Sequence, residues 1–248
     1  MIGVKLHFSR FEFKYVLPAR NVSELEKDMR YFLEFDPFVR DIEGHYYDVR
    51  SLYFDDPAYS AFYNKIEGTH TRAKFRIRTY TNEAQNDTAQ FLEIKGRYNN
   101  LVFKHRTQIG PEFHIGDDGE DEMIHKVVRA TRQDKLGQRF EYELFRKRIR
   151  PIALVIYKRR PYVSRFDPDF RLTLDSDLTA VRARGLFQPG SGPAGRDIMP
   201  GYTVVEVKFR RHIPSWFHRL IQAHELRSVS VSKICKAMEV LELAEDPY

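Results

Sequence analysis

The stretch from His70 to Tyr80 alternates between basic and apolar residues with a period of two. This alternation predicts a β-strand with two different faces. One face carries Arg72, Lys74, Arg76 and Arg78, and the other carries Ala73, Phe75 and Ile77. Adjacent like charges repel one another, so a polyanion lying along the basic face would turn this repulsion into binding. The structural alternative is a solvated sheet face, because charged residues mostly face water.

The same division into a charged and an apolar face recurs along the chain. The unit Glu-x-Lys occurs three times, at Glu12/Lys14, Glu93/Lys95 and Glu206/Lys208, and Lys104 shares a face with Arg106. Two architectures fit this pattern. Either an open sheet turns its charged face to water, or about eight strands close into a barrel with the charges inside. The pattern alone favours neither.

The order of the predicted elements indicates an α+β fold with an antiparallel sheet or barrel of about eight strands and peripheral helices. Strands are expected at 8–17, 45–55, 70–80, 91–97, 101–109, 152–165, 170–178 and 202–210. Helices are expected at 23–35, 58–66, 120–132, 136–150, 214–226 and 229–244. Ser23 and Glu26 match a capping box at the start of the first helix. No clear boundary divides the sequence, so we expect one domain over residues 1–248.

Composition and charge narrow the class of protein. The chain has 41 Lys and Arg against 35 Asp and Glu, and a pI near 9.3, which suits an anionic ligand. The single cysteine, Cys235, excludes an internal disulfide and favours a reducing compartment. No apolar run resembles a signal peptide or a membrane span. We therefore expect a soluble, cytoplasmic protein.

The charged positions suit a phosphate site. Arginine offers a planar fork to phosphate oxygens and lysine a point charge. The glutamates would repel phosphate unless a divalent cation lay between, as Mg²⁺ or Mn²⁺ does when it bridges carboxylates and phosphates. Each glutamate could equally orient a neighbouring Lys or Arg. No Walker A sequence or zinc motif is present. Most aromatic residues of the charged strands, such as Phe75 and Phe209, fall on the opposite face, which argues against nucleic acid.

Taken together, these motifs resemble the vacuolar transporter chaperone (polyphosphate polymerase) domain of the triphosphate tunnel metalloenzyme, or CYTH-like, superfamily. The resemblance covers nearly the whole chain in the family's order. It rests on Arg10–Tyr15, Val49–Asp55, Arg72–Tyr80, Leu92–Lys95, Tyr157–Tyr162, Arg171–Asp175, Val205–Lys208 and Ser232-Lys233. It implies a closed antiparallel β-barrel tunnel that binds the phosphates of ATP or another triphosphate, or polyphosphate, with Mn²⁺ or Mg²⁺.

The resemblance also assigns roles to individual residues. It implies phosphate contacts by Lys14, Arg76, Arg78, Lys95, Lys104, Arg159, Lys208 and Lys233. We add Lys74 and Arg106, because each falls on the same face of its strand as one of these residues. Of these, Arg76, Arg78, Lys95, Arg159 and Lys208 are the expected catalytic residues. Glu206 matches the metal-binding carboxylate, with Glu12 and Glu93 as further candidates.

At one position the sequence differs from the motif of the hydrolase members of the superfamily. Hydrolase members carry Glu-x-Glu-x-Lys near the N-terminus, whereas this chain has Arg10 in the first glutamate position. The resemblance therefore favours a polyphosphate polymerase that transfers the terminal phosphate of ATP to a growing chain. A metal-dependent triphosphatase is the first alternative. The second is a non-catalytic module that binds polyphosphate or, with less support, nucleic acid. A membrane-protein partner is left open.

Overall fold

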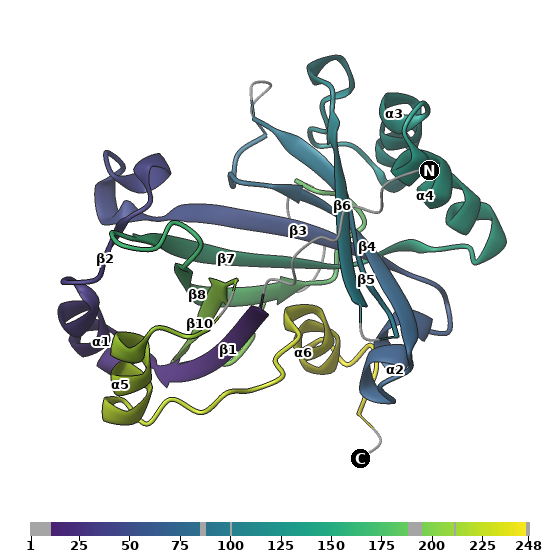
Figure 1. Cartoon of the computed structure of the whole chain (residues 1–248). Helices are drawn as coiled ribbons and strands as arrows, with labels where there is room; N and C mark the ends of the chain where they lie inside the picture. Colours follow the sequence, from purple (N-terminus) through teal and green to yellow (C-terminus); the bar gives the residue numbers. More distant parts are fainter. Residues whose placement is uncertain (1–10, 85–87, 100, 188–194, 211, 247–248) are drawn as a thin grey trace, which may run out of the picture. The chain divides into compact units, whose positions relative to one another are not determined.

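The computed structural model describes residues 11–84, 88–99, 101–187, 195–210 and 212–246. Within them, ten strands form one sheet with the hydrogen-bonded order β1-β10-β8-β7-β3-β4-β5-β6 (Figure 1). Two short strands lie off this path, where β2 pairs with β7 and β9 pairs with β8. Every strand pairing with a resolved register is antiparallel. With its helices, the chain is an α+β protein, and the predicted fold class is confirmed. Closure of the sheet into a tunnel stays a prediction.

The chain folds as two compact units, which are described separately. Unit 1 is drawn from Met1–Tyr47, Lys158–Asp177 and Met199–Val231. Unit 2 is drawn from Asp48–Tyr157, Leu178–Ile198 and Ser232–Tyr248. Strands β7 (Arg150–Ser164) and β8 (Arg171–Val181) run through both. The expectation of one domain over residues 1–248 stays a prediction.

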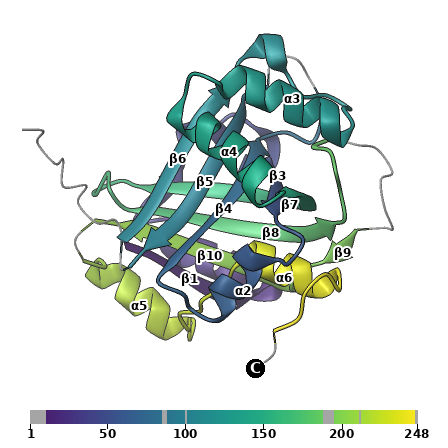
Figure 2. The ribbon, with the colours of Figure 1, turned by 90° about the vertical axis from the view of Figure 1, so that its right-hand side faces the viewer.

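Unit 2 is built on four consecutive strands. These are β3 (Tyr47–Asp55), β4 (Thr71–Thr79), β5 (Gln90–Tyr98) and β6 (Leu101–Ile109). Its helices are α2 (Ser60–Ile66), α3 (Glu120–Thr131), α4 (Lys135–Arg146) and α6 (Lys233–Val240), and β9 spans Arg196–Asp197. Figures 1 and 2 place α3 and α4 along one side of β4, β5 and β6.

The alternation seen in the sequence sorts the β4 side chains between two environments. Phe75 and Ile77 are buried in a cluster with residues of β3, β5, α3 and α4, and Ala73 packs against it. Phe140 of α4, fully buried, meets Phe54 and Phe75 with ring centroids 5.1 and 5.4 Å apart. Because side chains alternate across a strand, Lys74, Arg76 and Arg78 lie on the opposite face. The helices thus cover the apolar face of the sheet, and the basic face is the candidate functional site described below.

Unit 1 contains β1 (Phe11–Pro18), α1 (Val22–Met29), β2 (Leu33–Phe35), β10 (Tyr202–Phe209) and α5 (Ser215–Ala223). Short 3₁₀ turns occur at Ala19–Asn21, Pro37–Val39 and Glu43–His45, and in unit 2 at Pro111–Phe113. Alternate residues of β1, β8 and β10 bury one apolar face against α1 and α5, with Phe170 and Phe217 fully buried. The charged residues of these strands lie on the other face.

Three helix predictions were wrong in their bounds, and one of them, expected over 229–244, spans only Lys233–Val240. The helix expected over 23–35 ends at Met29, and Leu33–Phe35 instead pairs with Tyr162–Ser164 of β7. Asn21, not Ser23, is its N-cap, and no side chain caps it, so the capping box is not formed. The helix expected to reach residue 150 ends at Arg146, because Arg150 already belongs to β7. Among the described residues, no helix is long and apolar enough to cross a membrane.

Candidate functional site

On one face of strands β3 to β6 of unit 2, the side chains, most of them polar, lie in three rows that run across the sheet. In the middle row, Tyr53, Arg76, Glu93 and Arg106 are register partners on successive strands. A second row contains Lys74, Lys95 and Lys104. The third contains Ser51, Arg78, Phe91 and Gln108. Antiparallel pairing therefore brings together, on one face, the predicted residues of unit 2 that lie on strands.

Arg76 is held through its three guanidinium nitrogens by two side chains. Its Nε lies 2.7 Å and its Nη2 2.5 Å from Oε2 of Glu93, and its Nη1 donates to the hydroxyl of Tyr53 at 3.0 Å. Glu93 is fully buried, and its other oxygen lies 2.8 Å from Nζ of Lys104. Burial alone would raise the pKa of Glu93, but Arg76, Arg78 and Lys104 lower it to about 2. Glu93 is therefore a charged anchor that orients Arg76 and Lys104.

Arg78 is anchored by hydroxyl groups. Its Nε donates to Oγ of Ser51 at 3.0 Å, and its Nη2 donates to the hydroxyl of Tyr157 at 3.4 Å. The ammonium of Lys233, on α6, lies 4.9 Å from the centre of the Tyr157 ring. The hydroxyl groups of Ser51 and Tyr157 thus hold Arg78 in place.

The lysine row places three ammonium groups on neighbouring strands. Like charges directly opposite one another destabilise a sheet. Lys74 donates to Oγ of Ser232 at 3.2 Å. Burial lowers the pKa of both Lys74 and Lys104, although nearby groups, Glu93 in the case of Lys104, oppose the shift. A polyanion on this row would relieve both the repulsion and the cost of burying the charges.

Tyr53 is the most strongly perturbed neutral group on this face. Burial would raise the pKa of its phenol, but the charges of Arg76, Arg78 and Lys74 and the hydrogen bond from Arg76 lower it to about 7. The remaining predicted residue on these strands, Arg106, stacks its guanidinium 4.6 Å above the ring of Phe91. The face therefore contains fixed cations and one hydroxyl that can exchange a proton near neutral pH.

Unit 1 carries a smaller charged face on β1, β7, β8 and β10. Arg159 donates to both oxygens of the fully buried Asp175, at 2.7 and 2.8 Å. Glu206 lies 2.6 Å from Nζ of Lys208 and 3.9 Å from Nη2 of Arg159. Register pairs Lys14 with Glu206, and Glu12 with Lys208.

Lys14 has its own contacts on this face. Its Nζ donates to the carbonyl of Val231 at 3.1 Å and lies 3.5 Å from Glu12. Beside Glu206, the buried hydroxyl of Thr173 has no hydrogen-bond partner among the described residues. This face therefore combines three predicted cations with two predicted carboxylates.

The carboxylates can be tested as metal ligands. Among the described residues, no group of three His, Cys, Asp or Glu side chains could hold an ion. Glu93 does not fit, because it is buried between Arg76 and Lys104. Glu206, mostly buried beside the partnerless hydroxyl of Thr173, fits one carboxylate contact to an ion held mainly by phosphate oxygens. Glu12, exposed on the neighbouring strand, is the second carboxylate of that face.

Sequence reasoning found the cations of the site and missed the groups that hold them. Tyr53, Ser51 and Tyr157 were not singled out as anchors, and neither was Asp175. The alternation of Ser51 and Tyr53 along their strand was a usable signal, since both fall on one face. Arg10, in the position where hydrolases carry glutamate, lies outside the described residues.

Comparison with known proteins identifies the family. The model of the VTC domain matches residues 9–242, so the chain belongs to the VTC domain family. The resemblance noted in the sequence is thereby confirmed. Vacuolar transporter chaperone complex subunit 4 of Schizosaccharomyces pombe is 22% identical over 268 residues, which cover 92% of this chain and 36% of that protein. The chain spans about a third of the length of this curated relative.

Solved structures similar to the chain have low identity. A protein from Bacillus halodurans, described as a candidate adenylate cyclase, is 13% identical with a TM-score of 0.48, and the match covers 89% of this chain and 92% of that one. A protein from Vibrio parahaemolyticus with the same description is 13% identical with a TM-score of 0.44, over 94% and 97% of the two chains.

Proposed function

We propose that the chain is a polyphosphate polymerase, which transfers the terminal phosphate of ATP to a growing polyphosphate chain. The observation that carries the proposal is the cationic face of unit 2, where Arg76 and Arg78 are held by protein side chains beside a row of three lysines. Membership of the VTC domain family supports the same ligand class.

The face suits a chain of phosphates better than a single anion. The lysine row places one lysine on each of three adjacent strands, and adjacent strands of a sheet lie about 4.8 Å apart. Arg76 and Arg78 have their orientation set before any ligand binds, so little reorganisation is needed when charge develops on the transferring group. We infer that the lysine row holds the phosphate chain and that the two arginines neutralise the phosphoryl group in transfer.

The reaction needs little covalent chemistry from the protein. An oxygen of the terminal phosphate of the acceptor forms a bond to the γ-phosphorus of ATP, and the bond between that phosphorus and the β–γ bridging oxygen breaks. ADP leaves with the electron pair, and the polyphosphate is one unit longer. The acceptor oxygen is already anionic at neutral pH, so in-line positioning and charge neutralisation suffice.

In unit 1, Arg159 and Lys208 are proposed phosphate contacts, with Arg159 held by Asp175. Glu206, with Glu12 as a second candidate, would hold Mn²⁺ or Mg²⁺, and such an ion would supply charge neutralisation between phosphate oxygens. Location in the cytoplasm is part of this proposal and stays a prediction.

A triphosphatase is the second candidate, and Tyr53 is the observation that favours it. Water, unlike a phosphate acceptor, must lose a proton during attack, and the phenolate of Tyr53, whose pKa is lowered to about 7, can accept one.

Product analysis distinguishes the candidates. The purified chain is incubated with ATP and Mn²⁺ or Mg²⁺, and the products are resolved by length on a gel. A ladder of polyphosphate supports the polymerase, and free phosphate without a ladder supports the triphosphatase. Polyphosphate binding without turnover would replace both with a binding module.

A further inference from the structure

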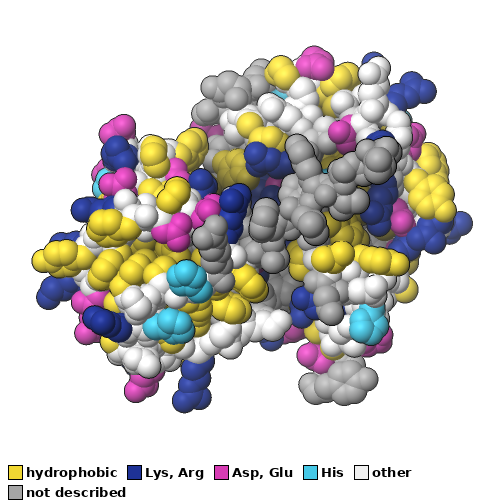
Figure 3. Space-filling model, in the orientation of Figure 1, with side chains coloured by type: hydrophobic (Ala, Val, Ile, Leu, Met, Phe, Trp, Pro, Cys, Tyr) yellow, Lys and Arg dark blue, Asp and Glu magenta, His cyan; other side chains and the backbone are white. Residues whose placement is uncertain are grey.

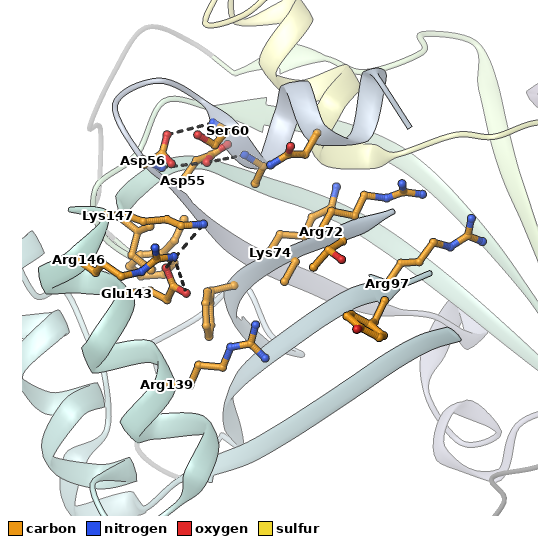
Figure 4. Close-up of a pocket in the computed structure, with 18 of the residues that line it drawn as sticks. Asp55, Asp56, Ser60, Arg72, Lys74, Arg97, Arg139, Glu143, Arg146 and Lys147 are labelled. Carbon is orange, nitrogen blue, oxygen red and sulfur yellow. Dashed lines mark hydrogen bonds and ion pairs between the residues drawn. The ribbon is translucent and has the colours of Figure 1, made fainter. Parts of the chain in front are cut away.

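A cavity lies in unit 2, on the side of the sheet that α4 covers. Its volume is about 430 Å³, within the range of small-molecule sites. Residues of α2, β4, β5, β6 and α4 line it, and so do Phe54 and Ile149. Figure 4 shows α4 forming one wall, with Asp55 and Asp56 near α2. The apolar residues Ala73 and Phe75 belong to this cavity, whereas Arg76 and Arg78 do not line it.

The α4 wall is positively charged. Arg139, Glu143, Arg146 and Lys147 recur at helical spacing, and Figure 4 shows them on the side of α4 that faces the strands. Arg146 and Lys147 share one carboxylate, that of Glu143, at 3.1 and 3.7 Å. Among the described residues, no carboxylate pairs with Arg139. Figure 3 likewise shows basic side chains gathered over α4. The wall therefore has an excess of positive charge directed at the cavity.

The acidic residues of the cavity do not neutralise this wall. Asp55 accepts hydrogen bonds from the backbone N–H groups of Asp56, Ala61 and Phe62. Asp56 accepts from those of Ala58 and Ser60, both at 3.0 Å. Both carboxylates are thus engaged at the start of α2. They would repel an anionic group, so the acidic end of the cavity is at α2. Its basic residues lie on α4 and, as Arg72, Lys74 and Arg97, on β4 and β5.

An aromatic ring forms part of the cavity surface. Ala73, Gly96 and Phe103 are register partners on β4, β5 and β6. A Cβ atom at Gly96 would overlap the Phe103 ring and lie 2.7 Å from the carbonyl oxygen of Arg72, so glycine lets the ring lie against the strand. The guanidinium of Arg139 lies 5.8 Å from the centre of that ring. A planar apolar surface and an arginine without a carboxylate partner are therefore neighbours.

We propose that this cavity binds a nucleoside phosphate, with the phosphate on Arg139, Arg146 and Lys147 and the base against Phe103. Bases stack on aromatic rings, and arginine pairs with phosphate through its planar fork. The acidic end suits the amino group of a base, because Asp and Glu carboxylates accept hydrogen bonds from such donors. Lys74 of the lysine row also lines the cavity, so this site adjoins the cationic face of β3 to β6. Its proposed phosphate contacts come from α4 and do not depend on the activity proposed for that face.

The test is calorimetric titration of the full chain with AMP, adenosine and inorganic phosphate, each without a metal ion. AMP is expected to bind, and adenosine and phosphate to bind at least about tenfold more weakly. Arg139→Ser is expected to weaken AMP binding about tenfold, the scale of one lost charge-assisted contact. Phe103→Leu, which keeps an apolar side chain, tests the ring separately. Arg219→Ser, on the exposed side of α5 in unit 1, is the matched control and should bind AMP like the parent.

Three results would overturn the proposal. These are no AMP binding by the folded parent chain, phosphate binding as tight as AMP, and AMP binding that Arg76→Ala abolishes but Arg139→Ser leaves intact. The last would place the nucleotide on the cationic face instead. Circular dichroism of each variant verifies that it folds, and retained AMP binding by a folded Phe103→Leu variant would exclude the ring from the site. Polyphosphate synthesis is not measured, so failure here is distinct from failure of the proposed function.

Discussion

The hydroxyl of Tyr53 accepts a hydrogen bond from Nη1 of Arg76 at 3.0 Å, while the guanidinium carbon lies 5.7 Å from the centre of the same ring. Tyr53 and Glu93 together restrain the guanidinium on two sides. Through this hydrogen bond, the guanidinium of Arg76 contacts a phenol whose pKa is lowered to about 7. This contact therefore links polyanion binding to pH.

Tripolyphosphate binding is expected to weaken as pH rises through about 7. The pKa of Tyr53 is lowered to about 7, so above that pH the phenol becomes an anion beside Arg76 and opposes a polyanionic ligand. Below it, the neutral hydroxyl can donate to a phosphate oxygen. Calorimetric titration on both sides of pH 7 measures the change, and Tyr53→Phe corrects for titration of the ligand itself. The same slope in parent and variant would contradict this role for Tyr53.

Ultraviolet absorbance gives an independent measure of the same group. Of the 14 tyrosines, one should form tyrosinate near pH 7, and that transition should be missing from Tyr53→Phe. Because folding lowers the pKa of Tyr53, ionisation of its phenol stabilises the folded state. This contribution to the free energy of unfolding is complete above about pH 10, the ordinary pKa of tyrosine. It is lost as pH falls through about 7.

Glu93→Gln is expected to lower the free energy of unfolding by about 3 kcal/mol, because it leaves Arg76 and Lys104 without their buried carboxylate. Urea denaturation at neutral pH measures the loss. Glu67→Gln, at an exposed position after α2, should stay within about 0.5 kcal/mol of the parent. Because folding lowers the pKa of Glu93 to about 2, its ionised carboxylate stabilises the folded state. This contribution to the free energy of unfolding is complete above about pH 4.5 and is lost as the pH falls through about 2. Equal stability of the two variants would show that Glu93 is not an anchor.

Lys95→Gln is expected to weaken tripolyphosphate binding. The central lysine of the row contributes attraction to a polyanion, and its removal relieves repulsion from Lys74 and Lys104. Binding measured at two salt concentrations should also show a smaller salt dependence than the parent, since fewer charges are paired. Lys27→Gln, exposed on α1, is the matched control. A variant that unfolds more readily but binds normally would assign Lys95 a structural role.

Asp175→Asn tests the charged face of unit 1. The substitution removes the charge that holds Arg159 at 2.7 and 2.8 Å, and breaking such a buried pair typically costs about 3 kcal/mol. Arg159→Lys keeps a positive charge but cannot form both contacts at once, so it should also weaken triphosphate binding. Denaturation and titration measure the two effects. Unchanged binding in a folded Arg159→Lys variant would remove Arg159 from the phosphate contacts.

The period-two alternation of the sequence was sufficient to predict which residues of a strand lie on its charged face and which on its apolar face. Arg76 and Phe75 were separated correctly, because alternation is a local property of a strand. It was not sufficient to assign partners. That Tyr53 meets Arg76, or Arg159 meets Asp175, depends on the register between strands, which no local pattern records. Leu33–Phe35 was mistaken for helix because short apolar runs fit both periods, and its pairing with Tyr162–Ser164 decides between them.

The most direct test of the central claim, that the cationic face of unit 2 holds the phosphates during transfer, is polyphosphate synthesis by Arg76→Ala. ATP and Mn²⁺ or Mg²⁺ are supplied, and chain lengths are compared on a gel with those made by the parent and by Arg30→Ala, at an exposed position after α1. We predict a ladder for the parent and for Arg30→Ala, and none for folded Arg76→Ala. A full ladder from folded Arg76→Ala would contradict the account.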